Sequence, residues 1–193
     1  VASKNIVELL DEEICSDFDK IDMVLLGTAD EVARQIAAGG VNSKVLNRYL
    51  QRQLERLPEA ISLRVADAQG RVRYGPGLDA QVAVNIADRE YFIRQRESSG
   101  NVLVIARPLF ARISKEWSIP VSRRISGPGG SFAGVVYVNT AISHLYKTFA
   151  NIELGAHGSV AMFNPELEIF ARYPEPKGAG SVIGKKFAVE QWQ

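Results

Sequence analysis

The chain has 193 residues, of which 46% are hydrophobic and 23% are charged, and its formal net charge is +1. This length and composition allow a substantial buried core, and the near-zero charge gives no broad field to attract nucleic acid or an anionic membrane surface. One cysteine excludes an intramolecular disulfide, and two histidines without acidic neighbours at ligand spacing argue against a metal centre.

The first part of the chain predicts two helices. Between residues 5 and 38 apolar side chains recur at three- and four-residue steps, which predicts one long amphipathic helix with Gly27 as a potential break. A second helix is predicted with Ser43 as its cap, and it ends before Pro58. We therefore expect an N-terminal helical region over residues 1–57. The missing initiator methionine and the absence of a signal-peptide core suggest a fragment of a longer protein.

The pattern then changes from helical spacing to alternation. Residues 60–75 predict two strands around a turn at Gly70, a helix starts near Asp88, and three further strands are predicted over 101–110, 116–125 and 132–140. This order predicts an α+β module over residues 58–141, with a mainly antiparallel five-stranded sheet flanked by helices.

The remaining segment, residues 142–193, predicts a linking helix followed by the start of a second module. Its hairpin over residues 159–174 resembles the first hairpin in having a strand, a turn and a second strand that ends at a proline. Only about twenty residues follow, too few for a helix and three more strands. The second module is therefore expected to be partial or reduced.

The stretch ADREYF, residues 87–92, contains the first candidate site residues. Asp88 is expected to be the N-cap of a helix, where an acid accepts backbone N–H bonds. Arg89 lies at the positive end of that helix, which is electrostatically unfavourable without a partner. An anionic ligand would be such a partner; an exposed or acid-paired arginine is the alternative.

Strand alternation supplies further candidates. Arg107 falls on a face that is otherwise apolar, so it either lines a pocket or extends to the strand end. In the strand EWSIPVSRRI, Ser122 and one of the two arginines are candidates; Arg123 is taken here, although alternation leaves the choice between Arg123 and Arg124 open. Tyr137 shares a face of the next strand with other inward residues.

The segments ADREYF, ARPLFARISKEWSIPVSRRI, GSFAGVVYVN and LGAHGSVAMFN together resemble the double Cache family of extracytoplasmic sensor domains, over about residues 1 to 185. The resemblance implies PAS-like modules, with a long helix rising from the membrane, a membrane-distal module and a membrane-proximal one. It also implies a periplasmic part of a bacterial inner-membrane receptor. Transmembrane helices and a histidine kinase, diguanylate cyclase or chemoreceptor output would then lie outside this chain.

The same resemblance implies a ligand site. Amino-acid-binding members carry an Arg-x-Trp-Tyr pattern; here Arg89 keeps the arginine, whereas Tyr91 replaces the tryptophan and Phe92 replaces the tyrosine. Those members also carry an aspartate for the ligand ammonium at the position of Asn139. An asparagine carries no negative charge, so a small carboxylate without an amine is favoured. The candidate ligand-binding residues are Arg89, Tyr91, Arg107, Ser122, Arg123, Tyr137 and Asn139.

Three functional hypotheses follow. The first is a ligand-sensing domain that binds a small carboxylate and forms a homodimer through the N-terminal helix. The alternative is a periplasmic dimerisation or protein-interaction module without a ligand. An enzyme is disfavoured, because no GxSxG, HExxH, P-loop or GxGxxG motif occurs, and no haem or flavin motif indicates a cofactor.

Overall fold

The computed structural model describes residues 2–79, 83–152, 154–155, 157–176 and 181–187. Its longest element is helix α1 (Ala2–Ala37), which runs without interruption past Gly27. One stripe of α1 is buried against the sheet, and it includes Ile21 and Leu25, which are fully buried. A Cβ on Gly27 would lie 3.5 Å from the Tyr49 hydroxyl, an ordinary van der Waals contact, so the helix packing does not require glycine here.

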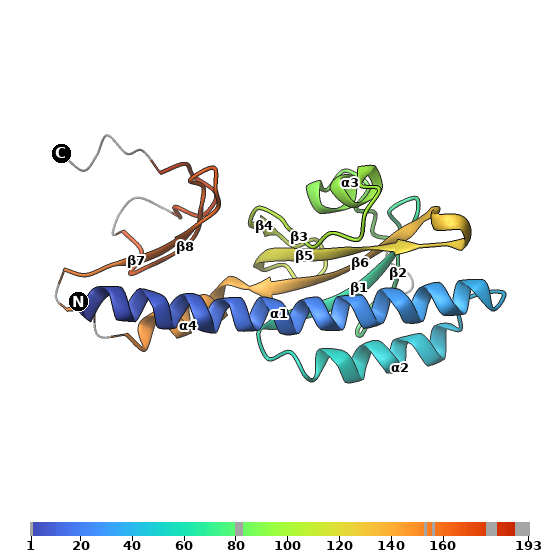
Figure 1. Cartoon of the computed structure of the whole chain (residues 1–193), viewed down its shortest axis with the longest axis horizontal. Helices are drawn as coiled ribbons and strands as arrows, with labels where there is room; N and C mark the ends of the chain where they lie inside the picture. Colours follow the sequence, from blue (N-terminus) through green and yellow to red (C-terminus); the bar gives the residue numbers. More distant parts are fainter. Residues whose placement is uncertain (1, 80–82, 153, 156, 177–180, 188–193) are drawn as a thin grey trace.

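Helix α2 (Ser43–Leu54) packs beside α1 and beneath the sheet (Figure 1). Its N-cap is Asn42, one residue before the predicted cap Ser43, and the Asn42 side chain accepts a hydrogen bond from the Val45 N–H at 3.1 Å. Leu46 and Leu50, one turn apart, are both fully buried. The helix is therefore fixed by its apolar face as well as by its cap.

The sheet is antiparallel, and its strand order is β2-β1-β6-β5-β3, with β4 also paired to β5. Helices α1 and α2 cover one face and α3 (Glu90–Glu97) covers the other, which gives three layers (Figure 1). The predicted antiparallel sheet with flanking helices is confirmed. The strands are β1 (Ala60–Asp67), β2 (Val72–Tyr74), β3 (Val104–Ile105), β4 (Leu109–Phe110), β5 (Trp117–Ser126) and β6 (Phe132–Ala141).

One predicted strand is divided in the structure. Residues 101–110 form two strands of two residues each, β3 and β4, which both pair with β5 and are separated by residues 106–108. Pro108 supplies no N–H to a ladder and constrains the backbone of Arg107 before it. The side-chain alternation predicted for one strand over residues 101–110 therefore does not extend to Arg107.

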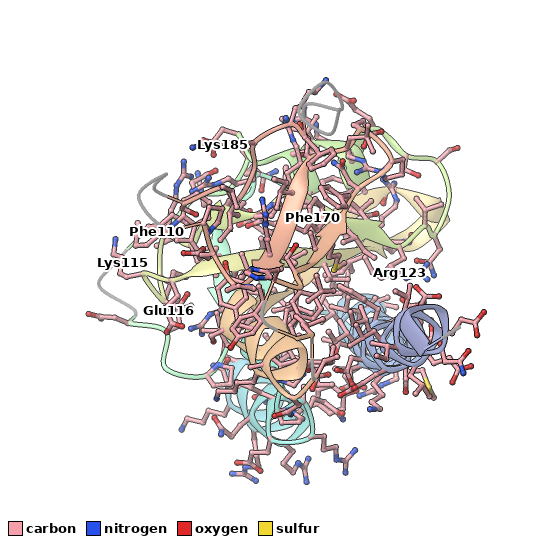
Figure 2. All side chains as sticks on the ribbon, turned by 90° about the vertical axis from the view of Figure 1, so that its left-hand side faces the viewer. Phe110, Lys115, Glu116, Arg123, Phe170 and Lys185 are labelled. Carbon is pink, nitrogen blue, oxygen red and sulfur yellow. The ribbon has the colours of Figure 1, made fainter. Side chains whose placement is uncertain are left out.

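The last elements are α4 (Ile142–Ala150) and the hairpin of β7 (Val160–Phe163) and β8 (Ile169–Tyr173). An apolar cluster joins them to the rest of the molecule: Leu10 of α1, Ile119 of β5 and Phe149 of α4 pack with Phe170 of β8. Figure 2 views the molecule from this end, with Phe170 near the centre of the view. The predicted linking helix and second hairpin are thus present.

Candidate functional site

A cavity lies between the α3-facing side of the sheet, the start of α3 and the segment around β4. Its empty space is about 290 Å³ when the open mouth is included, but its interior has room for only about one water molecule, about 10 Å³. A bound ligand would therefore have to displace some of the side chains that line it. The lining residues are Val84, Ile86, Arg89, Tyr91, Leu109, Ala111, Arg112, Ile113, Tyr137 and Asn139.

Arg89 occupies the N-cap position of α3, with an extended backbone and no side-chain capping hydrogen bond. Its side chain is half-buried in the cavity wall. Within the described ranges its guanidinium has neither a hydrogen bond nor an ion pair. A cation at the positive end of a helix gains nothing from the helix dipole, so Arg89 is left with unused donors beside the cavity.

Arg112 supplies a second guanidinium. Its Nη1 and Nη2 donate to the two carboxylate oxygens of Asp88, at 2.9 and 2.6 Å, and Nη1 also donates to the Asn85 carbonyl oxygen. The hydrogen bond from Arg112 lowers the pKa of the Asp88 carboxyl. The predicted capping role of Asp88 is wrong, because Arg89 is the N-cap and the Asp88 side chain pairs with Arg112.

Two buried tyrosines form the floor of the cavity. Tyr91 and Tyr137 are each 3% exposed, and their ring centroids lie 5.1 Å apart. Burial raises the pKa of Tyr137 to about 12 and raises that of Tyr91 well above its usual value. Both phenols are therefore neutral at pH 7. The Tyr91 hydroxyl donates to the Tyr137 oxygen, so the Tyr137 O–H is the one that can donate to an anion.

Asn139 contributes a neutral amide on the same face of β6. Its Nδ2 donates to the Ser62 hydroxyl at 3.1 Å, and its buried Oδ1 has no partner among the described residues. Since a hydroxyl can both donate and accept, the amide can present either its oxygen or its nitrogen to the cavity. Asn139 thus offers a hydrogen bond without a charge.

Arg64 lies next to Tyr137, its register partner across β1 and β6. It is 5% exposed, and its Nη1 donates to the Pro76 carbonyl oxygen, while Nε has no partner within the described part of the chain. No described carboxylate forms an ion pair with it, and burial lowers its pKa. An arginine remains protonated even so, which adds positive charge beside Tyr137.

Four of the seven predicted ligand residues line this cavity, namely Arg89, Tyr91, Tyr137 and Asn139. Arg107, Ser122 and Arg123 do not line it. Arg107 is an exposed residue outside the short strands, and its guanidinium pairs with Glu90 at 2.9 Å and with Glu168 at 3.6 Å. It therefore connects the start of α3 to the second hairpin.

Ser122 is fully buried beneath α3. Its carbonyl oxygen accepts a hydrogen bond from Gln95 Nε2 at 2.7 Å, and its hydroxyl lies 3.4 Å from the Tyr91 carbonyl oxygen. It thus supports the helix that carries Tyr91. Arg124 lies on the same sheet face but donates to carbonyl oxygens at the end of α3, including those of Gln95 and Ser98, each at 3.2 Å.

Arg123 lies on the opposite face of the sheet, beside the long helix (Figure 2). Its Nε and Nη2 donate to the two carboxylate oxygens of Asp22 in α1, at 2.6 and 2.8 Å. Its assignment as a pocket residue conflicts with this geometry, because neighbouring strand residues such as Ser122 and Arg123 point to opposite faces.

Sequence reasoning missed Arg112 and most of the apolar lining. Arg112 lies in the connection between β4 and β5, where no periodicity indicates direction. Over the described residues there is no group of three or more His, Cys, Asp or Glu side chains arranged to hold a metal ion, nor a helix long and apolar enough to cross a membrane.

No protein-family model matches the chain, and no curated protein matches it by sequence. Among solved structures, the chain is similar to the extracellular domain of rpHK1S-Z16, a protein assigned as a histidine kinase. The TM-score is 0.79 and the identity 25%, over 88% of this chain and 68% of that one.

Two further solved structures are similar in fold. The sensor domain of the V. cholerae histidine kinase DctB has a TM-score of 0.67 and 16% identity, over 89% of this chain and 65% of that one. The ligand-binding domain of the Pseudomonas aeruginosa chemoreceptor PctC, in complex with GABA, has a TM-score of 0.73 and 15% identity, over 97% and 80%. The chain therefore has the Cache, or PAS-like, fold of extracellular sensor domains of histidine kinases and chemoreceptors.

Proposed function

We propose that the chain is the extracytoplasmic ligand-sensing domain of a membrane receptor, and that its cavity binds a small carboxylate. The observation that carries this proposal is Arg89, a cavity-lining guanidinium with no hydrogen-bond or ion-pair partner among the described residues. A guanidinium binds a carboxylate through two parallel N–H···O bonds. The neutral phenols of Tyr91 and Tyr137 line the same cavity, and the O–H of Tyr137 adds a donor.

The charge around the cavity also supports an anionic ligand. Arg89 and Arg112 line it, and Arg64 lies beside Tyr137 on the neighbouring strand, whereas Asp88 is the carboxylate that pairs with Arg112. A ligand anion would reduce this excess of positive charge in a partly desolvated site, where electrostatic attraction is stronger than in water.

The ligand class is narrowed by Asn139. PctC was solved with GABA, which carries an ammonium group as well as a carboxylate. An ammonium in this cavity would meet the neutral amide of Asn139 and two arginines. We therefore propose an acid without an amine, since an ammonium would be desolvated here without a compensating charge.

The signal would pass from α3 to α1 through the sheet, and α1 would also mediate a homodimer. A ligand can shift the equilibrium between two signalling states of the domain only by the difference in its affinity for those states, typically about 1–3 kcal/mol. Any kinase or cyclase activity, and the membrane attachment, would belong to other parts of the receptor.

A thermal-shift panel tests the proposal. Acetate, butyrate, succinate, alanine and GABA are compared on the purified domain, and at least one simple acid is expected to raise Tm. Arg89→Ala should abolish the rise, whereas Arg96→Ala, which removes an exposed arginine of the same helix outside the cavity, should retain it. No shift with any acid, or an equal shift in Arg89→Ala, would refute carboxylate binding at this site.

A protein-interaction module remains the second candidate, because α1 exposes large apolar side chains. Val7, Leu9 and Met23 are 60%, 66% and 74% exposed. Light scattering of the wild type and of Met23→Glu measures whether α1 mediates a dimer. A concentration-dependent dimer that Met23→Glu dissociates, combined with a flat ligand panel, would favour the interaction module over the sensor.

A further inference from the structure

The guanidinium of Arg112 has N–H groups beside the cavity that no described residue accepts. Of the five N–H groups of an arginine, Nη1 uses both of its own on Asp88 and the Asn85 carbonyl, and Nη2 uses one on Asp88. The Nε–H and the second Nη2–H have no partner within the described ranges. The side chain is 40% exposed and lines the cavity together with Arg89.

We propose that Arg112 is a second acid-binding group of the cavity, that Asp88 competes with the ligand for it, and that the pair of arginines makes the cavity selective for dicarboxylic acids. This inference rests on the proposed function, because it assigns the second acid group of a ligand whose first carboxylate is held by Arg89. One carboxylate would bind each guanidinium, and the ligand would bridge α3 and the segment after β4.

Asp88 is suited to be displaced. Its side chain is 63% exposed, so its carboxylate is solvated by water as soon as it leaves Arg112. Exposed ion pairs contribute little to stability, because water screens the attraction and both side chains lose freedom. A ligand carboxylate on Arg112 would belong to a molecule whose other end is held by Arg89, whereas the Asp88 carboxylate is bound here only through its pair with Arg112.

The apolar lining suits the link between two acid groups. Leu109 and Ile113, which are close to Arg112 in sequence, line the cavity, and Ile86 lines it from the segment before α3. In a cavity opened by the release of Arg112 from Asp88, methylene groups of a short diacid would pack on these side chains while its ends reach the two arginines. A monocarboxylate of the same length would leave Arg112 paired to Asp88.

The test compares succinate with butyrate, which has the same number of carbons and one acid group. Their affinities are measured by calorimetry on the wild type, Arg112→Gln, Asp88→Asn and the control Arg96→Gln. We expect the wild type to bind succinate more tightly. Arg112→Gln should weaken succinate by about tenfold or more, as for a lost charge-assisted bond, and change butyrate by less than about twofold.

Asp88→Asn should tighten succinate by several-fold and leave butyrate nearly unchanged, because the competing carboxylate is gone. Arg112→Lys retains the charge without the planar fork, and we expect an intermediate succinate affinity. Far-ultraviolet circular dichroism verifies that each variant is folded.

The outcomes separate the two proposals. If both acids bind and depend on Arg89, but Arg112→Gln affects them equally or not at all, the role of Arg112 is refuted while the carboxylate sensor stands. If Asp88→Asn weakens succinate, Asp88 positions Arg112 and does not compete for it. If neither acid binds the wild type, the carboxylate site and this inference both fail.

Discussion

The ion pair between Asp22 and Arg123 joins α1 to β5, and its removal should destabilise the domain measurably. Both oxygens of Asp22 are engaged, at 2.6 and 2.8 Å, and the two side chains are 23% and 11% exposed. Breaking a buried pair costs about 3–5 kcal/mol and breaking an exposed one about 0–1 kcal/mol. This pair is intermediate, so Asp22→Ala should lower the free energy of unfolding by about 2 kcal/mol.

Urea unfolding followed by circular dichroism measures this loss, which also corresponds to a decrease in Tm of about 4–8 °C for a chain of this size. Lys20→Ala is the matched control on the same helix, because it breaks the exposed pair with Asp17 and should cost less than about 0.5 kcal/mol. A double-mutant cycle with Arg123→Ala should give a coupling of about 1–2 kcal/mol. If Asp22→Ala costs no more than Lys20→Ala, the pair does not hold α1 to the sheet.

Three further predictions concern the sheet and α3. Gly134→Ala should destabilise by about 2 kcal/mol or more in urea unfolding, because φ at this position is +146° and a Cβ would lie 2.1 Å from the Ala66 carbonyl oxygen. Phe92→Ala should cost about 3–5 kcal/mol by the same measurement, since its ring is fully buried against the sheet; a loss below 1 kcal/mol would contradict the observed packing. Tyr137 should ionise near pH 12 when folded, against about pH 10 when unfolded, so its contribution to stability is intact below pH 10 and is lost as pH rises toward 12; tyrosinate absorbance in native and denatured protein measures this.

The fold was largely predictable because each element carries its own periodic signal. The apolar steps along residues 5–38 predict α1, and the structure has a helix at Ala2–Ala37. The predicted strand over residues 101–110 divides at Pro108, where one missing N–H and one constrained neighbour outweigh the apolar alternation. The backbone restrictions of proline, and not the apolar pattern, therefore determine where this strand divides.

The site was predictable only in part. Alternation along a strand shows which side chains share a sheet face, but it does not show which residues they contact. Tyr137 and Asn139 were placed on one face of β6, and both line the cavity. Alternation leaves the choice between Arg123 and Arg124 open, because it does not show which sheet face α1 covers; in the structure Arg123 pairs with Asp22 of α1. Arg112 lies in a connection without periodicity, so its position depends on tertiary packing that one sequence does not encode locally.

The two faces of β5 suggest how the proposed site could influence α1. Ser122 and Arg123 are adjacent, and their side chains point to opposite faces. On one face Ser122 contacts α3 at Gln95 and at the Tyr91 carbonyl; on the other Arg123 holds Asp22. Because β5 pairs with β3 and β4 on one side and with β6 on the other, movement of its backbone would disturb several ladders at once. A ligand that bound Arg89 without displacing α3 relative to β5 would therefore occupy the cavity without altering the contact between β5 and α1, and its affinity alone would not produce a signal.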